Sequence, residues 1–170
     1  MAQETMDQQR VRSQVEALFD ALNSHDVDGT VALMTDDVLW KDPSSSDPLR
    51  GHDAVAERVR AMFRAFGEIH LELHDIYEAA VDAKAASHWR MQARLTGTLD
   101  PPGFAPTGRT ADIEGACLYE FRDGKFAKHT IIYDTTDMAV QLGLMPSQDS
   151  AQSRMMVRMQ RLSAKFRRRR

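Results

Sequence analysis

The amino-acid sequence predicts an α+β fold, with helices in the first third of the chain and an antiparallel sheet in the rest. Apolar residues recur at helical spacing between residues 7 and 66. From Ile69 onward they alternate with polar residues at the period of two that is typical of strands. Near the end, Asp123-Gly124 is a dipeptide that commonly joins two antiparallel strands in a tight turn.

Length and composition indicate one globular domain with a substantial core. The chain has 170 residues, of which 42% are hydrophobic and 28% charged, as in ordinary globular domains. No apolar run approaches the roughly 20 residues that cross a bilayer. Residues 1–12 hold no apolar signal core, and the single cysteine, Cys117, excludes an intrachain disulfide. These features predict no membrane span and a cytoplasmic location.

The net charge of −3 conceals a basic tail on an acidic body. From Arg154 onward there are eight basic residues and no acid, which leaves 14 basic and 25 acidic residues, a net charge of −11, in the rest. The tail also carries apolar residues at helical spacing, so residues 147–170 read as a linker and a basic amphipathic helix. We expect this helix to dock on the acidic body of its own chain or of a neighbouring subunit. Binding of the tail to an anionic membrane or to nucleic acid is an alternative, but it needs more than one short basic run.

Three helices are predicted before the sheet. The first covers residues 7–23 and is broken at Ser24-His25-Asp26, where Asp26 can cap a short second helix that runs to Met34. Asp36-Asp37 is predicted to be a turn. The third helix opens at residue 51 and ends at Gly67.

A short strand is predicted between the second and third helices. Its alternation places Trp40 and Asp42 on one face, and a loop follows from Pro43 to Pro48. In the later meander, the clearest strand signal places Trp89 and Met91 on an apolar face, after a turn near Asp82.

The last two strands are predicted at residues 110–122 and 126–135. Alternation divides the final strand between two faces, of which we take the one with Ile132 as inward. That assignment carries three candidate residues inward: Thr130, Ile132 and Asp134. The other three then face outward unless a bulge shifts the register: His129, Ile131 and Tyr133. An acid on a core face is expensive unless it is paired or functional, which singles out Asp134.

The order of these elements resembles the nuclear transport factor 2-like superfamily, and three groups of motifs resemble its SnoaL-like branch of polyketide cyclases. The motifs are Trp40-Lys41-Asp42-Pro43 with residues 49–55, Pro106-Thr107-Gly108-Arg109, and residues 121–129 with Tyr133-Asp134 and residues 141–146. The resemblance implies a cone-shaped fold, in which N-terminal helices and a curved antiparallel sheet enclose a pocket. The resemblance spans residues 8–146, and residues 1–146 are predicted to form one domain.

In the cyclases of this family, the acid that matches Asp134 is the general acid/base, commonly assisted by a histidine on the preceding strand. This sequence has no histidine near Cys117 and Tyr119, and it has Thr130 where the family usually has tryptophan. The resemblance therefore implies an acid-centred pocket more firmly than it implies cyclase activity.

The candidate site consists of two acids and an apolar wall. Asp134 and Asp42 are the predicted catalytic residues. The predicted substrate-binding residues are Trp40, Trp89, Met91, Cys117, Tyr119, Thr130 and Ile132. Five of these nine residues have a plainer interpretation: Asp134 could cap a turn, Asp42 could form an Asx-type turn, Trp89 and Met91 could be ordinary core, and Cys117 could be an inert buried thiol.

No metal or other cofactor is predicted. His70 and His74 are four positions apart, but on a strand this separation is about 13 Å, too far for two ligands of one ion. The function expected is therefore cofactor-free acid/base catalysis on a hydrophobic, carbonyl-bearing small molecule, either an aldol cyclisation or an isomerisation. The alternative is a non-catalytic binding module with the same pocket. We also expect a homodimer through the outer face of the meander.

Overall fold

The computed structural model describes residues 2–79, 83–147 and 149–167, and it confirms the α+β class. Helices and strands alternate at first, and a meander follows. The elements are α1 (Ala2–Asn23), α2 (Val27–Ala32), β1 (Met34–Lys41), β2 (Leu49–Arg50), α3 (Gly51–Ala65), β3 (Phe66–Glu78), β4 (Lys84–Leu95), β5 (Thr110–Arg122), β6 (Lys125–Tyr133), α4 (Thr135–Gln141) and α5 (Ala151–Arg167).

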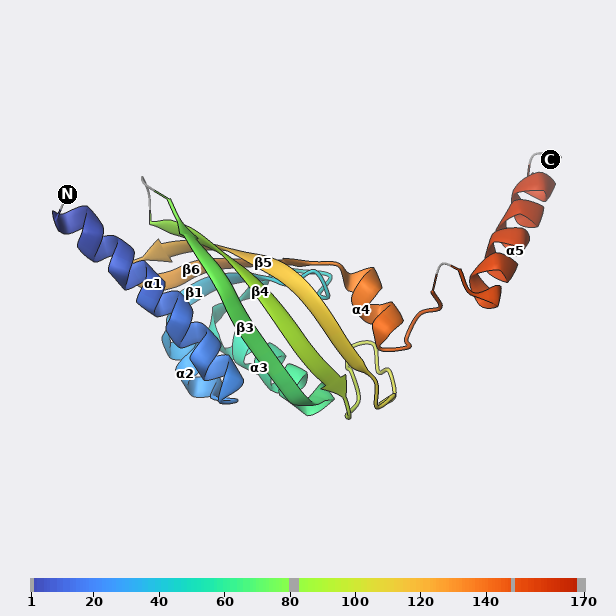
Figure 1. Ribbon diagram of the computed structural model, residues 1–170, viewed down its shortest axis with the longest axis horizontal. Coiled ribbons are helices and arrows are strands. Elements are labelled where there is room, and N and C mark those ends of the chain that lie inside the picture. The colour runs from blue at the N-terminus through green and yellow to red at the C-terminus, as the bar shows by residue number, and fades with distance from the viewer. Residues whose placement is uncertain (1, 80–82, 148, 168–170) are drawn as a thin grey trace.

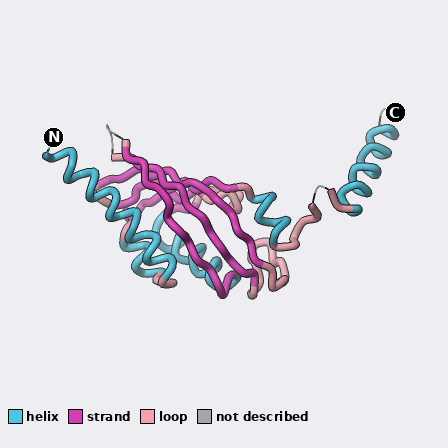
Figure 2. Tube along the Cα trace, in the orientation of Figure 1, coloured by secondary structure: helices cyan, strands magenta, loops and turns pink. Residues whose placement is uncertain are grey.

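The six strands form one curved sheet in the order β2-β1-β6-β5-β4-β3. Neighbouring strands are antiparallel, as predicted, except that β1 and β6 run parallel. Helices α1, α2 and α3 gather on one side of the sheet (Figures 1 and 2). The core lies between these helices and the sheet, so one face of each central strand is apolar.

The first helices follow the predicted pattern with shifted ends. α1 buries Val15 and Leu18 against the sheet. Asp26 caps α2 as predicted, because its Oδ1 accepts a hydrogen bond of 2.8 Å from the Gly29 N–H. The predicted turn at Asp36-Asp37 is wrong, since both residues lie inside β1.

Strand β4 carries the alternation that the sequence predicted. Trp89, Met91 and Leu95 are buried on the inner face, while the polar residues between them lie on the outer face. The turn predicted near Asp82 lies outside the described residues.

A β-bulge near the start of β6 reverses the faces that were predicted for this strand. The Asp123-Gly124 turn forms as expected, with positive φ at both residues. Phe126 then pairs with Phe121 and Lys128 with Glu120, so β6 holds one extra residue, Ala127. The extra residue shifts the alternation after Phe126.

After the bulge, the inner face of β6 belongs to the residues that were expected outside. His129 is buried, and Ile131 and Tyr133 share its face. Thr130 and Ile132 turn to the outer face, where the Ile132 side chain is 49% exposed. The prediction that these two residues face the core is therefore wrong.

The strand also ends earlier than predicted, and α4 follows it. The side chain of Gln141 holds α4 to β5: its Oε1 accepts the Asp112 N–H at 2.7 Å, and its Nε2 donates to the Asp112 carbonyl at 3.0 Å. Leu142, just after α4, is fully buried.

Helix α5 lies beyond α4, away from the sheet and the other helices (Figure 1). Its methionines Met155, Met156 and Met159 are each at least 60% exposed. The expected docking on the body is therefore absent within the described part of this chain, and docking on a second copy stays a prediction. None of the described helices is long and apolar enough to span a membrane.

Deleting residues 147–170 should leave the fold intact, because α5 buries none of the described core. We expect a midpoint of thermal unfolding within about 2 °C of the full chain, measured by circular dichroism. As a control, a chain that ends at residue 133 also loses the buried Leu142 and should melt clearly lower. A large loss of stability from the shorter deletion would contradict this division of the chain.

Candidate functional site

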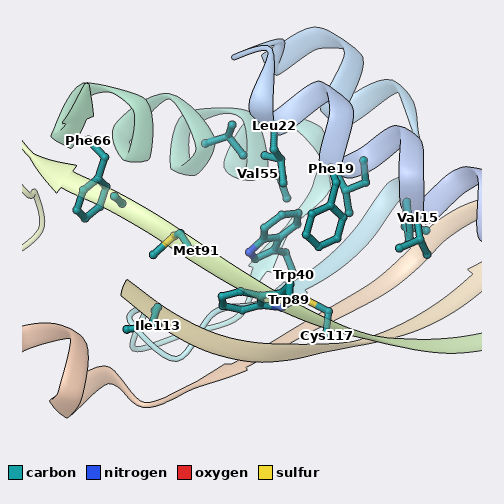
Figure 3. Close-up of a cluster of buried hydrophobic side chains, with 14 of the residues drawn as sticks. Val15, Phe19, Leu22, Trp40, Val55, Phe66, Trp89, Met91, Ile113 and Cys117 are labelled. Carbon is teal, nitrogen blue, oxygen red and sulfur yellow. Dashed lines mark hydrogen bonds between the residues drawn. The ribbon is translucent and has the colours of Figure 1, made fainter. Parts of the chain in front are cut away.

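A cavity of about 90 Å³ lies between the helices and the inner face of the sheet. We call it the inner chamber. α1, α3 and all strands except β2 contribute to its wall, which is mostly apolar (Figure 3). The sheet register brings Trp40, His129 and Tyr119 into one row across β1, β6 and β5.

His129 lies in this row without a hydrogen-bond partner among the described residues at either ring nitrogen. It is only 2% exposed, and its ring centroid is 4.2 Å from that of Trp40 and 4.9 Å from that of Tyr119. Burial lowers the pKa of His129 to about 3. The imidazole is therefore neutral at physiological pH, with one nitrogen able to donate and the other able to accept.

Trp40 adds a second unpaired group on the same side of the chamber. Its indole Nε1 is buried and has no partner in the described chain. Figure 3 shows this nitrogen on the side of the ring that faces Met91. Buried polar atoms are nearly always paired, so three unpaired nitrogens in one wall require an explanation.

In the adjoining part of the wall, on β4 and β5, the buried side-chain polar atoms are paired. Trp89 Nε1 donates to Cys117 Sγ at 3.2 Å, and Ser87 Oγ lies 2.8 Å from the Tyr119 hydroxyl. Burial raises the pKa of Cys117 to about 12, so its thiol is inert. The Trp89 ring occupies the space where Gly115 lacks a side chain, since an added Cβ would lie 2.3 Å from Cζ2 of Trp89.

Asp42 lies at one end of the chamber and is the one carboxylate that the described part of the chain contributes to its wall. Its side chain is 8% exposed. Oδ1 accepts hydrogen bonds from Ser44 N at 2.9 Å and Ser44 Oγ at 2.7 Å. Oδ2 accepts from Arg58 Nε at 3.0 Å and lies 2.8 Å from Arg58 Nη2.

Tyr133 completes this polar end. Its hydroxyl is 3.5 Å from Asp42 Oδ1, a long contact in which the hydroxyl donates. Burial, together with the charge of Asp42, raises the pKa of Tyr133 to about 12. The phenol therefore keeps its proton and can act as a hydrogen-bond donor.

A second cavity of about 230 Å³ adjoins the first, and we call it the vestibule. The two share Arg58, Phe66, Tyr133 and Met138 as walls, so the Asp42–Arg58–Tyr133 group stands at the boundary between them. The rest of its wall comes from residues 43–45, from α4 with Leu142 and Leu144, and from the segment between Leu99 and Phe104. That segment is closed by backbone hydrogen bonds between Leu99 and Phe104 of 2.9 and 3.0 Å.

The structure brings six of the nine predicted site residues into the wall of the inner chamber. These are Trp40, Asp42, Trp89, Met91, Cys117 and Tyr119. Thr130 and Ile132 are not among them, because the bulge turns both to the outer face.

Asp134 also lies outside both cavities, so its predicted position on the inner face is wrong. It is exposed and caps α4: Oδ1 accepts from Thr136 N at 2.8 Å and from Asp137 N at 2.9 Å. Asp134 therefore has the plainer of its two predicted interpretations, that of a strand-end acid that caps a turn.

Three residues of the site were missed by sequence reasoning: Arg58, His129 and Tyr133. For His129 and Tyr133, the only signal was the possibility of a bulge. Arg58 gave none, because its partner Asp42 is 16 positions away. Among the described residues, no group of three or more His, Cys, Asp or Glu side chains could hold a metal ion.

The fold and the chamber define a cone of the nuclear transport factor 2-like class. Within that class, the chain belongs to the SnoaL-like family: the model of the SnoaL-like domain matches residues 15–129. No functionally curated protein matches the sequence.

Solved structures agree on the fold. A protein from Jannaschia sp. CCS1, provisionally assigned as a SnoaL-like polyketide cyclase, has a TM-score of 0.72 at 16% identity, over 81% of this chain and 94% of that one. TerC, co-crystallised with polyporic acid, has a TM-score of 0.65 at 18% identity, over 79% and 98%. SalBIII, an epoxide hydrolase/cyclase-like enzyme of pyran ring formation in salinomycin, has a TM-score of 0.65 at 21% identity, over 77% and 95%.

Replacing His129 with Phe should flatten the pH dependence of stability. The folded pKa of about 3 lies below the ordinary value of 6.5, so the unfolded chain binds a proton first as the pH falls. His129 thus contributes stability that is complete above pH 6.5 and is lost toward pH 3. By pH 5 the wild type should lose about 2 kcal/mol that His129→Phe retains.

Urea unfolding at pH 7 and pH 5 measures this difference. His88→Phe, on the outer face of the sheet, is the matched control and should keep the wild-type dependence. At pH 7, His129→Phe should be at least as stable as the wild type, because it removes two unpaired buried nitrogens. Equal pH dependence in His129→Phe and the wild type would contradict the buried neutral imidazole.

Proposed function

We propose that this protein binds a hydrophobic, carbonyl-bearing small molecule in the inner chamber and catalyses proton transfer on it without a cofactor. The observation that carries the proposal is the unpaired set of nitrogens on Trp40 and His129 in an otherwise apolar wall. A ligand oxygen that accepts from Trp40 Nε1, and a second hydrogen bond at His129, would pair groups that are otherwise costly to bury.

The chemistry of the chamber favours an uncharged ligand group inside it. The imidazole is neutral. Among the described residues of the wall, the charged side chains are Asp42 and Arg58, and these two form an ion pair. At about 90 Å³ the chamber is smaller than the ~150 Å³ cavity known to take up benzene, so it suits one ring or less. A larger ligand would extend past Tyr133 into the vestibule.

Asp42 is the proposed proton acceptor. A substrate carbonyl at the boundary of the two cavities would place its α carbon beside the carboxylate. The C–H proton would pass to Asp42, and the electron pair would form an enolate whose oxygen accepts a hydrogen bond from the Tyr133 hydroxyl. In an aldol cyclisation, the enolate carbon attacks a second carbonyl, and the alkoxide so formed takes the proton back from Asp42. In an isomerisation, Asp42 returns the proton to a different carbon of the enolate system. Arg58 would hold Asp42 in place.

The neighbours support the class of ligand rather than its identity. TerC was crystallised with a small organic molecule, and SalBIII is described as acting in pyran ring formation. Family membership supports cyclase- or isomerase-type chemistry in the same way.

A second candidate function is binding without catalysis. The observation that favours it is the engagement of Asp42, whose two oxygens already accept from Ser44 and Arg58. Both oxygens are therefore already engaged, and a substrate proton could reach Asp42 only if substrate binding displaced one of these partners. In this candidate, the same chamber would serve only to hold the ligand.

The assembly we propose is a homodimer through the outer face of the sheet. Leu118 and Ile132 lie on neighbouring strands of this face and are 48% and 49% exposed. Pairing this patch with its copy would bury apolar surface that water now covers. The free thiol of Cys117 accords with a reducing, cytoplasmic location.

The catalytic candidate predicts enzyme-dependent exchange of the α protons of 2-tetralone with solvent deuterium. Exchange followed by NMR in D₂O should be faster with the wild type than in buffer. Asp42→Asn should lower the enzyme-dependent rate at least about 100-fold, because it removes the proton acceptor. Asp134→Asn is the matched control, and it should exchange at the wild-type rate because Asp134 lies outside both cavities and asparagine caps a helix as well as aspartate does.

Binding measured in the same samples separates the two candidates. Saturable binding of 2-tetralone to the wild type without exchange would support the binding module. Exchange that survives in Asp42→Asn would place the proton acceptor elsewhere.

A further inference from the structure

Helix α5 combines exposed apolar side chains with an exclusively basic set of charges. Met155 and Met159 are one helical turn apart and are 64% and 60% exposed. Arg154, Arg158 and Arg161 recur at spacings of four and three residues, which forms a second stripe beside the first.

The surroundings of α5 leave both stripes uncovered. The helix lies away from the sheet (Figure 1), and its described arginines are exposed. The one described contact of these side chains is local: Arg154 donates to the carbonyl of Asp149 at 2.5 Å. No acidic residue follows Asp149 in the sequence, so the tail cannot neutralise itself.

The acidic body is a poor match for this helix. Several of its surface carboxylates already have cationic partners: Asp112 has Arg90, Glu120 has Lys128, and Glu57 has Arg64. A stripe of methionines beside a stripe of arginines instead fits a surface that is anionic outside and apolar just beneath. That combination is the boundary of a bilayer with acidic headgroups.

We propose that α5 lies in the surface of an anionic phospholipid membrane and thereby anchors the domain there. Met155 and Met159 would enter the boundary of the acyl chains, and the three arginines would contact lipid phosphates. The helix would lie in the plane of the surface, consistent with its being too short and too polar to span a bilayer. The linker before α5 would keep the negatively charged body off the membrane.

Co-sedimentation of the full-length chain with vesicles tests this proposal. Vesicles of phosphatidylcholine with 30% phosphatidylserine should bind the wild type at least tenfold more tightly than vesicles of phosphatidylcholine alone. The triple variant Arg154→Gln/Arg158→Gln/Arg161→Gln should lose at least tenfold in affinity. The matched control Arg10→Gln/Arg60→Gln/Arg64→Gln removes the same charge from the body and should change affinity less than twofold.

The double variant Met155→Ser/Met159→Ser separates insertion from simple charge attraction. This variant should also lose at least tenfold in affinity for the vesicles. In the wild type, the part of the affinity that comes from the apolar stripe should be retained as salt rises, because salt screens only the charge attraction. Equal binding to both kinds of vesicle, no binding, or full binding by the methionine variant would each overturn the proposal. Self-association of the wild type that both α5 variants abolish, with no vesicle binding, would assign the helix to a second copy of the chain.

Discussion

The site depends on a single extra residue in β6. Ala127 has no counterpart on β5, so the alternation of β6 is out of step before and after it. This lets Phe126, which is fully buried, and His129 face the same side, although residues three positions apart face opposite sides of a regular strand. Without the bulge, Thr130 and Ile132 would face the helices, and His129 and Tyr133 would lie in water. The chamber would then lack its imidazole and the phenol of Tyr133.

The two walls of the chamber differ in how their polar atoms are satisfied. On β4 and β5, Trp89 pairs with Cys117, and Ser87 with Tyr119, so this wall is complete without a ligand. On β1 and β6, Trp40 and His129 are buried and unpaired, at a cost of roughly 1–3 kcal/mol for each such group. In the ligand-free protein, a phenyl ring in place of His129 would be less costly to bury than the imidazole. The imidazole therefore fits the proposed ligand site better than it fits an apolar core.

Local patterns predicted those parts of the structure that local physics determines. The alternation of β4 placed Trp89 and Met91 correctly, because a half-buried strand repeats every two residues whatever its neighbours do. Asp26 was identifiable as a cap for the same local reason. The bulge was not predictable, because Lys125-Phe126-Ala127-Lys128 contains no glycine to mark it and it exists only in pairing with β5. Arg58 could not be identified from the sequence because its role arises from a tertiary contact with Asp42.

Asp134 affects the cavities indirectly, because it lines neither of them but caps the helix that does. Its carboxylate accepts the first free N–H groups of α4 and so fixes where that helix begins. Gln141, at the other end, clamps α4 to the backbone of Asp112. Between these two anchors lies Met138, whose side chain lines both the inner chamber and the vestibule. Asp134, at the end of the last strand, thus affects the shape of the cavity through α4. The carboxylate that lines the cavity is that of Asp42, which directly follows the first strand.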